Sequence, residues 1–252
     1  MGVGLSMAKG GAVIPYPETL PNLLTWFRYN TKQSGNSGGK TLNHNLVDGE
    51  KIIKWENYGS EEGYLGNVAA DAPKFEIDDN TLEFSANSRF FNLFNDAGAE
   101  KTFEFAGAFT LIMRVRFTTT TNDAMFGHNN VDFFRLTNSK SFRTKIGGTN
   151  QNNFTEDSDE IDSGVGAPYY CIVFTRNGAE DTFVRVDGGE YNNKLWGGAG
   201  VQDTDTCTVS NIGCQADNVQ EMGGNVKDVL IYENYLSTTE MSDMYTFLNA
   251  QG

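Results

Sequence analysis

The stretch Tyr169–Asp187, YYCIVFTRNGAEDTFVRVD, decides the fold of this chain. It predicts a strand, a tight turn at Arg176–Asp181 and a second strand. In the first strand, residues 169–174 are all apolar or aromatic, so both faces of that strand are apolar. Such a strand belongs in the middle of a packed sheet rather than at its edge. The second strand, residues 182–187, alternates and continues the same sheet.

Length and composition favour a single all-β domain. The chain has 252 residues, of which 12% are aromatic, 28 are Gly and only 5 are Pro, as expected for short strands joined by glycine turns. We expect residues 1–17 to form an extended N-terminal arm and residues 18–252 to form one β-sandwich domain. The sequence contains no run of about 18 apolar residues, so it predicts no transmembrane helix. Residues 1–17 also lack the charged start and apolar run of a secretion signal.

The charge of the chain excludes several partners. With 33 acidic and 19 basic residues, the formal net charge is −14. This charge repels phosphate, so neither nucleic acid nor an anionic membrane is an expected partner. Three cysteines do not make a disulfide framework. Cys171 lies in the apolar strand and is expected to be buried, whereas Cys207 and Cys214 can pair only if the chain turns back between them.

Two further elements have clear patterns. Ala108–Phe117, AFTLIMRVRF, alternates with period two, which predicts a long strand with one core face and one partly solvated face. The end of the chain predicts a helix, because Ser237 and Glu240 have the spacing of a capping box. Apolar residues then recur every three or four positions, as in a helix that packs on a sheet. Residues 147–166 and 191–206 are expected to be loops, since they are rich in Gly, Asn and acidic residues.

The order of these segments resembles the concanavalin A-like lectin/glucanase superfamily in its laminin G and pentraxin-like form. The matching segments are LLTWFRY, Trp55–Asn57, Pro73, Leu82–Phe84, FTLIMRVRF, YYCIVFTRNG with VRVDGG, and GGNVKDVLIYENYLSTTEMSDMYTFL. The resemblance implies an all-β fold, a two-sheet antiparallel jelly-roll β-sandwich with one short C-terminal α-helix. Because members of this superfamily bind sugars, bind proteins, hydrolyse glycans or serve as structural modules, the resemblance leaves the function open.

No catalytic residues are predicted. A glycoside hydrolase of this superfamily would carry an E-x-D-x-x-E motif on a strand, which places two carboxylates across the scissile bond. The nearest segment is DSDEID, residues 157–162, and its Gly- and Asn-rich surroundings indicate a loop that would hold the carboxylates too loosely. We therefore expect a protein that is not an enzyme.

The same acidic segment is the candidate metal site. Oxygen ligands of this kind suit calcium, and the candidate ligands are Asp157, Asp159 and Asp162. The alternative is a solvated acidic loop that binds no ion. No other cofactor is predicted, because the histidines lack partners at zinc-ligand spacing.

Glycan binding would combine aromatic platforms with amide groups that hydrogen-bond to hydroxyls. The candidate residues are Tyr191, Asn192, Asn193 and Trp196 in one segment, and Asn129 and Asn130 beside His128 in another. The alternative for Trp196 is a place in the core beneath its loop.

These features suggest three functions. The favoured one is a non-catalytic structural protein of a bacteriophage virion, a capsid decoration or a tail or appendage component, because the arm and compact domain resemble such proteins. The arm would anchor it to other virion proteins in a homo-oligomeric or multicopy assembly, and the particle would assemble in the host cytoplasm. The second function is a glycan-binding module or adhesin that recognises host-surface glycans, and the third is a glycoside hydrolase.

Overall fold

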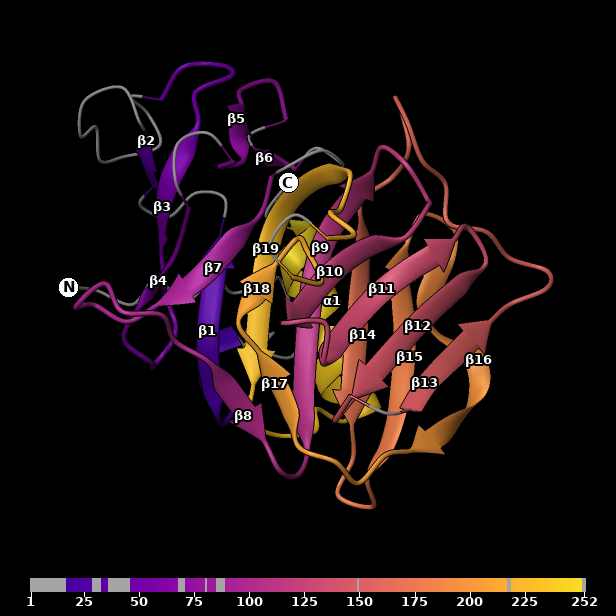
Figure 1. Cartoon of the computed structure of the whole chain (residues 1–252). Helices are drawn as coiled ribbons and strands as arrows, with labels where there is room; N and C mark the ends of the chain where they lie inside the picture. Colours follow the sequence, from indigo (N-terminus) through magenta and orange to yellow (C-terminus); the bar gives the residue numbers. More distant parts are fainter. Residues whose placement is uncertain are drawn as a thin grey trace, which may run out of the picture.

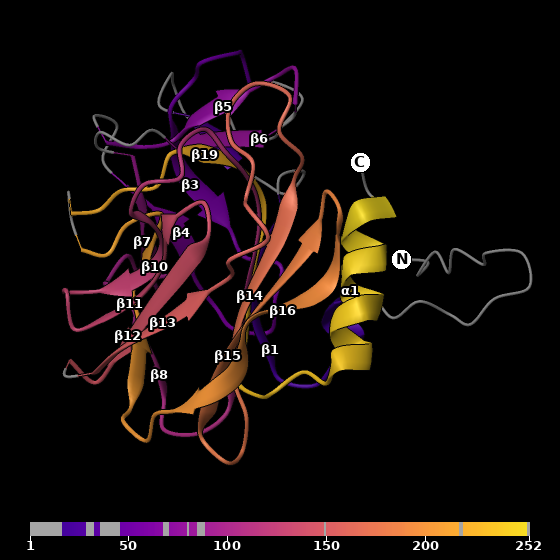
Figure 2. The same cartoon turned by 90° about the vertical axis from the view of Figure 1, so that its right-hand side faces the viewer.

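The computed structural model describes residues 17–28, 33–35, 46–67, 71–79, 81–84, 89–148, 150–216 and 219–250. Two large antiparallel sheets face each other, and one helix, α1 (Thr238–Ala250), lies outside the first sheet (Figures 1 and 2). A short 3-10 helix, η1 (Pro17–Thr19), precedes the first strand. The predicted all-β sandwich with one C-terminal helix is confirmed. The division at residue 18 stays a prediction, because residues 1–16 lie outside the described part of the chain.

The first sheet has the predicted hairpin near its middle. Strand β14 pairs with β9 on one side and β15 on the other, and every residue of β14 is buried. The sheet runs in the order β16 (Tyr191–Gln202), β15 (Asp181–Gly188), β14 (Tyr170–Arg176), β9 (Phe109–Phe117), β19 (Gly224–Tyr232), β6 (Thr81–Phe84) and β5 (Lys74–Glu76), and β1 (Leu23–Arg28) also pairs with β19.

The second sheet has nine strands and faces solvent on its outer side. Its order is β13 (Asn150–Thr155), β12 (Ser141–Ile146), β11 (Asp132–Asn138), β10 (Asp123–His128), β18 (Asn211–Ile212), β7 (Phe91–Phe94), β4 (Tyr64–Gly66), β3 (Ile52–Glu56) and β2 (Gln33–Gly35). A separate pair, β8 (Phe103–Phe105) and β17 (Cys207–Val209), lies at one end of the sandwich (Figure 1).

Aromatic residues fill the space between the sheets. Phe174 of β14 lies within 5.3–6.4 Å, between ring centroids, of Phe126, Phe134 and Phe142 from the facing sheet. This packing explains why the inward positions of β10, β11 and β12 are apolar while their outward positions are free to be polar.

The outer face of the first sheet is buried too, which corrects one expectation. Helix α1 covers it (Figure 2). Ile112 of β9 packs with residues of the helix in a second apolar cluster. Arg114 on the same face forms a buried ion pair with Asp228 at 3.8 Å and donates to the carbonyl of Leu248 in the helix at 2.5 Å. The partly solvated face predicted for residues 108–117 is therefore present only at Arg116, whose side chain is 20% exposed, because the helix excludes water from Ile112 and Arg114.

The helix begins as predicted. The backbone N–H of Ser237 donates to Glu240 at 2.7 Å, and the N–H of Glu240 donates to the Ser237 hydroxyl at 3.3 Å. This reciprocal pair is a capping box. No helix in the described residues is long and apolar enough to cross a membrane.

Four other expectations have clear outcomes. Residues 191–206 are not a loop, because β16 occupies twelve of them, and residues 147–166 include strand β13. Cys171 is buried as predicted, and Cys207 and Cys214 are buried free thiols rather than a disulfide.

Candidate functional site

The predicted aromatic platforms lie in the core. Trp196 has no exposed surface and Tyr191 is 7% exposed, and their rings pack edge to face at 5.4 Å. The Trp196 indole N–H donates to the carbonyl of Lys140 at 3.0 Å, and the Tyr191 hydroxyl donates to the carbonyl of Glu160 at 2.5 Å. Neither ring can present a face to a sugar. The platform prediction is wrong for both, and the alternative that Trp196 fills the core is confirmed.

The two predicted asparagine pairs lie on different sheets. Asn192 is exposed on β16 of the first sheet, and Asn193 donates from its side chain to the carbonyl of Thr238 at the start of α1 at 3.1 Å. Asn129 and Asn130 lie instead in the turn between β10 and β11 of the second sheet. The structure therefore does not bring the two predicted groups together in one site.

The three candidate metal ligands do not converge. The carboxylate of Asp159 binds the ammonium group of Lys194, and this hydrogen bond lowers the pKa of Asp159. Asp162 accepts a hydrogen bond from the Tyr170 hydroxyl at 3.4 Å, while Asp157 is exposed. Within the described ranges, no three His, Cys, Asp or Glu side chains form a group that could hold a metal ion. These residues thus offer calcium no ready ligand set, since a lysine already neutralises the central aspartate.

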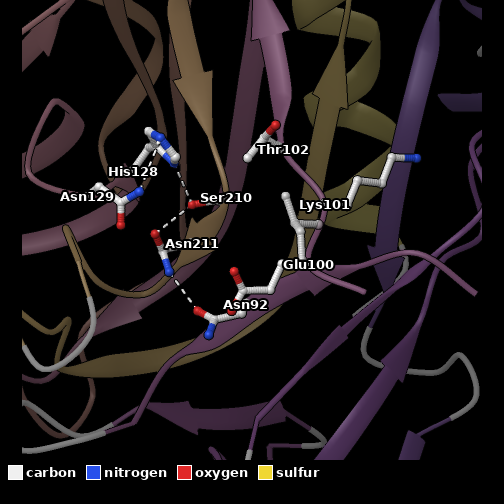
Figure 3. A pocket seen from close by; sticks show the side chains of 9 residues that line it. Asn92, Glu100, Lys101, Thr102, His128, Asn129, Ser210 and Asn211 are labelled. Atoms are coloured by element: carbon white, nitrogen blue, oxygen red, sulfur yellow. Dashed lines mark hydrogen bonds between the residues drawn. The ribbon is translucent and has the colours of Figure 1, made fainter. Parts of the chain in front are cut away.

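A polar hollow lies on the outer face of the second sheet, where β10, β18 and β7 run side by side (Figure 3). Its volume is about 80 Å³. The lining residues are Asn92, Leu93, Glu100, Lys101, Thr102, His128, Asn129, Ser210 and Asn211. Of the residues proposed from the sequence, only Asn129 belongs to it.

Five of these side chains form one hydrogen-bonded ladder, which is visible in Figure 3. Asn211 donates to Asn92 at 2.6 Å, and the Ser210 hydroxyl donates to Asn211 at 2.8 Å. Since that hydroxyl has a single proton, it must accept the contact of 2.9 Å from Nδ1–H of His128. The other ring nitrogen of His128 then accepts from the Asn129 amide at 3.3 Å. All four bonds run in one direction, from Asn129 to Asn92.

The backbone explains why these residues meet. Gly127 pairs with Asn211, which pairs with Asn92, so neighbouring strands place them in one row. Asn129 and Asn130 have φ values of 45° and 62°. The turn is closed by a hydrogen bond of 2.8 Å from the backbone N–H of Val131 to the carbonyl of His128. Asparagine is one of the few residues that favours this left-handed conformation, so these two positions also serve the hairpin.

A stacked aromatic pair adjoins the hollow, and sequence reasoning missed it. Tyr64 of β4 and Phe94 of β7 are paired across the strands, half-buried, with ring centroids 5.4 Å apart and an interplanar angle of 20°. Phe94 is two residues from Asn92 and therefore shares its face of β7. The signal was present in FNLF, residues 91–94, because its alternation places Phe94 on the opposite face from the buried Phe91 and Leu93.

The hollow continues into a wider groove toward the loop at residues 56–63. A further hollow of about 570 Å³ shares Glu100, Lys101 and Thr102 with it. A third hollow of about 370 Å³ shares Glu61 and Glu62 with the second. Lys101 connects the polar hollow with the groove, because its ammonium group donates to the Glu61 carboxylate at 3.0 Å and to the carbonyl of Glu62 at 2.9 Å. Volumes of this size are typical of ligand sites.

Comparison with known proteins shows similarity of structure only. No protein-family model matches the sequence, and no curated protein matches it. A sialidase of Trypanosoma rangeli matches with a TM-score of 0.58 and 13% identity over 96% of this chain and 35% of the sialidase. A mutant of that sialidase displaying trans-sialidase activity gives a TM-score of 0.59 at 13% identity, over the same shares of the two chains. The likeness to these structures is one of fold, a two-sheet β-sandwich.

A third similar structure is a GH54 α-L-arabinofuranosidase, with a TM-score of 0.55 and 11% identity over 93% of this chain and 60% of that one. The chain thus spans about a third of the sialidases and less than two thirds of the arabinofuranosidase. The prediction that the protein is not an enzyme is contradicted, because structures with this fold are named as enzymes. At these sequence identities the structural similarity shows a shared fold and does not show a shared function.

Proposed function

We propose that the protein binds glycans on the outer face of its second sheet. The observation that carries the proposal is the combination of the Asn129–Asn92 ladder with the half-buried Tyr64–Phe94 ring pair on one sheet face. Sugars present hydroxyl groups along their edges and C–H groups on their faces. Glycan-binding sites accordingly combine polar side chains of fixed orientation with aromatic rings.

The ladder is suited to this task because its own bonds fix each amide. A side chain that is already held in place loses little conformational entropy when a ligand binds. Within the described residues, the amide nitrogen of Asn92 and the amide oxygen of Asn129 have no hydrogen-bond partner in the protein. The ladder thus offers a donor at one end and an acceptor at the other, so separate hydroxyl groups of one glycan can bind at its two ends.

A glycan array, followed by calorimetry on any glycan that binds, tests the proposal. Asn92→Ala should weaken binding about tenfold, the equivalent of about one lost hydrogen bond. Asn192→Ala is the matched control, because Asn192 is exposed on the other sheet and should leave the affinity unchanged. A blank array with the folded protein, or equal effects of both substitutions, would refute the proposal.

Glycan cleavage is the second candidate, and it rests on the groove beside the hollow. Glu56, Glu61, Glu62 and Asp96 line the hollow of about 370 Å³, and most glycosidases use two carboxylates on either side of the scissile bond. Enzymes with this fold add support. Reducing-sugar release from the glycans found on the array is the assay, and Glu61→Gln and Glu62→Gln are the informative variants. No release by the wild-type protein would overturn this candidate.

Placement on a virion also stands as a proposal, supported by the sequence resemblance. The anchoring arm would be residues 1–17, of which residues 1–16 lie outside the described part of the chain. Deleting residues 1–17 should abolish incorporation into particles if the arm anchors the protein to other virion proteins. Unchanged incorporation of the shortened protein would end that proposal.

A further inference from the structure

Three basic side chains lie together on the outer face of the second sheet, although the chain as a whole is acidic. We name Arg135, Arg143 and Lys145 the basic strip. Arg135 of β11 lies directly opposite Arg143 of β12, and Lys145 follows two residues further along β12 on the same face. Like charges that face each other across two strands destabilise a sheet. A negatively charged partner would therefore offset the repulsion between these side chains.

Within the described residues, that partner is not a carboxylate of the protein. Arg143 donates to the side-chain oxygens of Asn153 at 2.7 Å and Gln151 at 3.4 Å. Lys145 donates to the backbone carbonyl of Asn130 at 3.1 Å. All of these acceptors are neutral, so the charges of the strip are oriented without being neutralised.

Arg135 is the most constrained of the three. Its terminal nitrogen donates to the side-chain oxygens of Gln215 at 3.1 Å and Gln220 at 3.3 Å, and its buried Nε has no hydrogen-bond partner. Burial and the charge of Arg143 lower the pKa of its guanidinium. A negatively charged ligand on the accessible part of the guanidinium would offset the repulsion between the two arginines.

The basic strip is continuous with the polar hollow. Gln215, which holds Arg135, donates from its other side-chain atom to the side chain of Asn130 at 2.8 Å. Asn130 is the neighbour in sequence of Asn129, where the ladder of the hollow begins. A single ligand could therefore span both, with sugar rings at the hollow and an acidic substituent on the strip.

We infer that the protein selects anionic glycans, whose carboxylate or sulfate groups bind the basic strip formed by Arg135, Arg143 and Lys145. This inference rests on the proposed glycan-binding function and names its ligand class. Guanidinium groups match the two-oxygen geometry of carboxylate and sulfate. The net negative charge disfavours a polyanion at long range, but it does not prevent local binding at the strip, because salt screens charges beyond about 8 Å at physiological ionic strength.

Calorimetry with polygalacturonate, and with the same polymer after methyl esterification, isolates the effect of the charge. The acid form should bind at least about tenfold more tightly than the neutral ester. Arg143→Gln should reduce this preference, since it removes one of the three charges of the strip, and an unchanged preference would overturn the inference. Arg89→Gln is the control, because Arg89 pairs with Glu83 at 2.7 Å away from the strip. Dextran sulfate in place of polygalacturonate shows whether sulfate or carboxylate is preferred.

A second measurement separates this inference from the glycan-binding proposal. Sodium sulfate should raise the melting temperature above its value in sodium chloride of equal ionic strength, and the gain should be smaller in Arg143→Gln than in Arg89→Gln. If that difference appears but no glycan binds, the strip is an anion site and the glycan proposal fails. If acid and ester forms bind equally, glycan binding stands and the inference is overturned. Tighter binding of a single-stranded oligonucleotide than of polygalacturonate would also overturn it.

Discussion

Replacing Arg176 by Met tests the account of how one end of the sandwich is held together. Arg176, at the end of β14, is completely buried. It donates to the backbone carbonyls of Gly107 at 2.7 Å, Phe105 at 2.6 Å, Asp203 at 3.2 Å and Asp205 at 2.5 Å. The side chain thus connects the segment before β9 with the segment after β16. Methionine has a similar length but no donor.

The expected loss in the free energy of unfolding follows from the carbonyl groups that Arg176→Met leaves without a donor. Those of Phe105 and Asp203 lie in buried bonds, whereas those of Gly107 and Asp205 are partly accessible and can regain water. A buried acceptor without a partner costs about 1–3 kcal/mol, so two of them give about 4 kcal/mol. For a chain of this size that loss lowers the melting temperature by about 8–16 °C.

Urea denaturation followed by tryptophan fluorescence measures the change in the free energy of unfolding. Arg176→Lys keeps the charge but has three donors for four carbonyls, so it should fall between the wild type and Arg176→Met. Arg89→Met, which breaks only a partly exposed ion pair with Glu83, should cost less than about 1 kcal/mol. A loss of less than about 1 kcal/mol in Arg176→Met would show that the carbonyls do not depend on the arginine, and the reasoning would be refuted.

Three further changes probe other parts of the molecule by the same denaturation measurement. Gly127→Ala should cost about 1–3 kcal/mol, because its Cβ would meet the backbone oxygen of Gln215 at 2.4 Å; an unchanged stability would show that this approach relaxes freely. Ser237→Ala should cost about 1 kcal/mol by removing the cap of α1, and no loss would contradict the capping role. Burial raises the pKa of Asp123 from 3.8 to about 6, so the unfolded chain loses this proton at lower pH than the folded protein. Stability should therefore fall as pH rises from about 4 to 6 and stay lower above that, and Asp123→Asn should gain about 3 kcal/mol relative to the wild type between pH 4 and pH 7. A constant difference between these two proteins across that range would refute the assignment.

The strands and the helix were predictable because their signals are local. The double-sided apolar run at residues 169–174 placed β14 inside a sheet, since burial of both faces requires neighbours on both sides. The capping box at Ser237 and Glu240 fixed the start of the helix, because those two residues satisfy backbone donors within one turn.

In this chain the local composition of a segment does not indicate which of its side chains are exposed. Trp196 and Tyr191 stand in a segment rich in Gly and Asn, yet the strand pairing of β16 directs both rings into the core. The residues that do line the hollow come from four separate segments, around Asn92, Lys101, His128 and Asn211. No spacing in the sequence indicates that these residues are neighbours, because their proximity depends on the order of strands in the sheet.

The sequence by itself determined the all-β class, the central hairpin and the C-terminal helix, since period-two alternation and helix caps act over a few residues. Only the tertiary structure decided that β18 lies between β10 and β7, so that Gly127, Asn211 and Asn92 form one row. The same pairing set Arg135 against Arg143. These placements depend on which strands meet, and strand order is a property of the packed sheets rather than of any one segment.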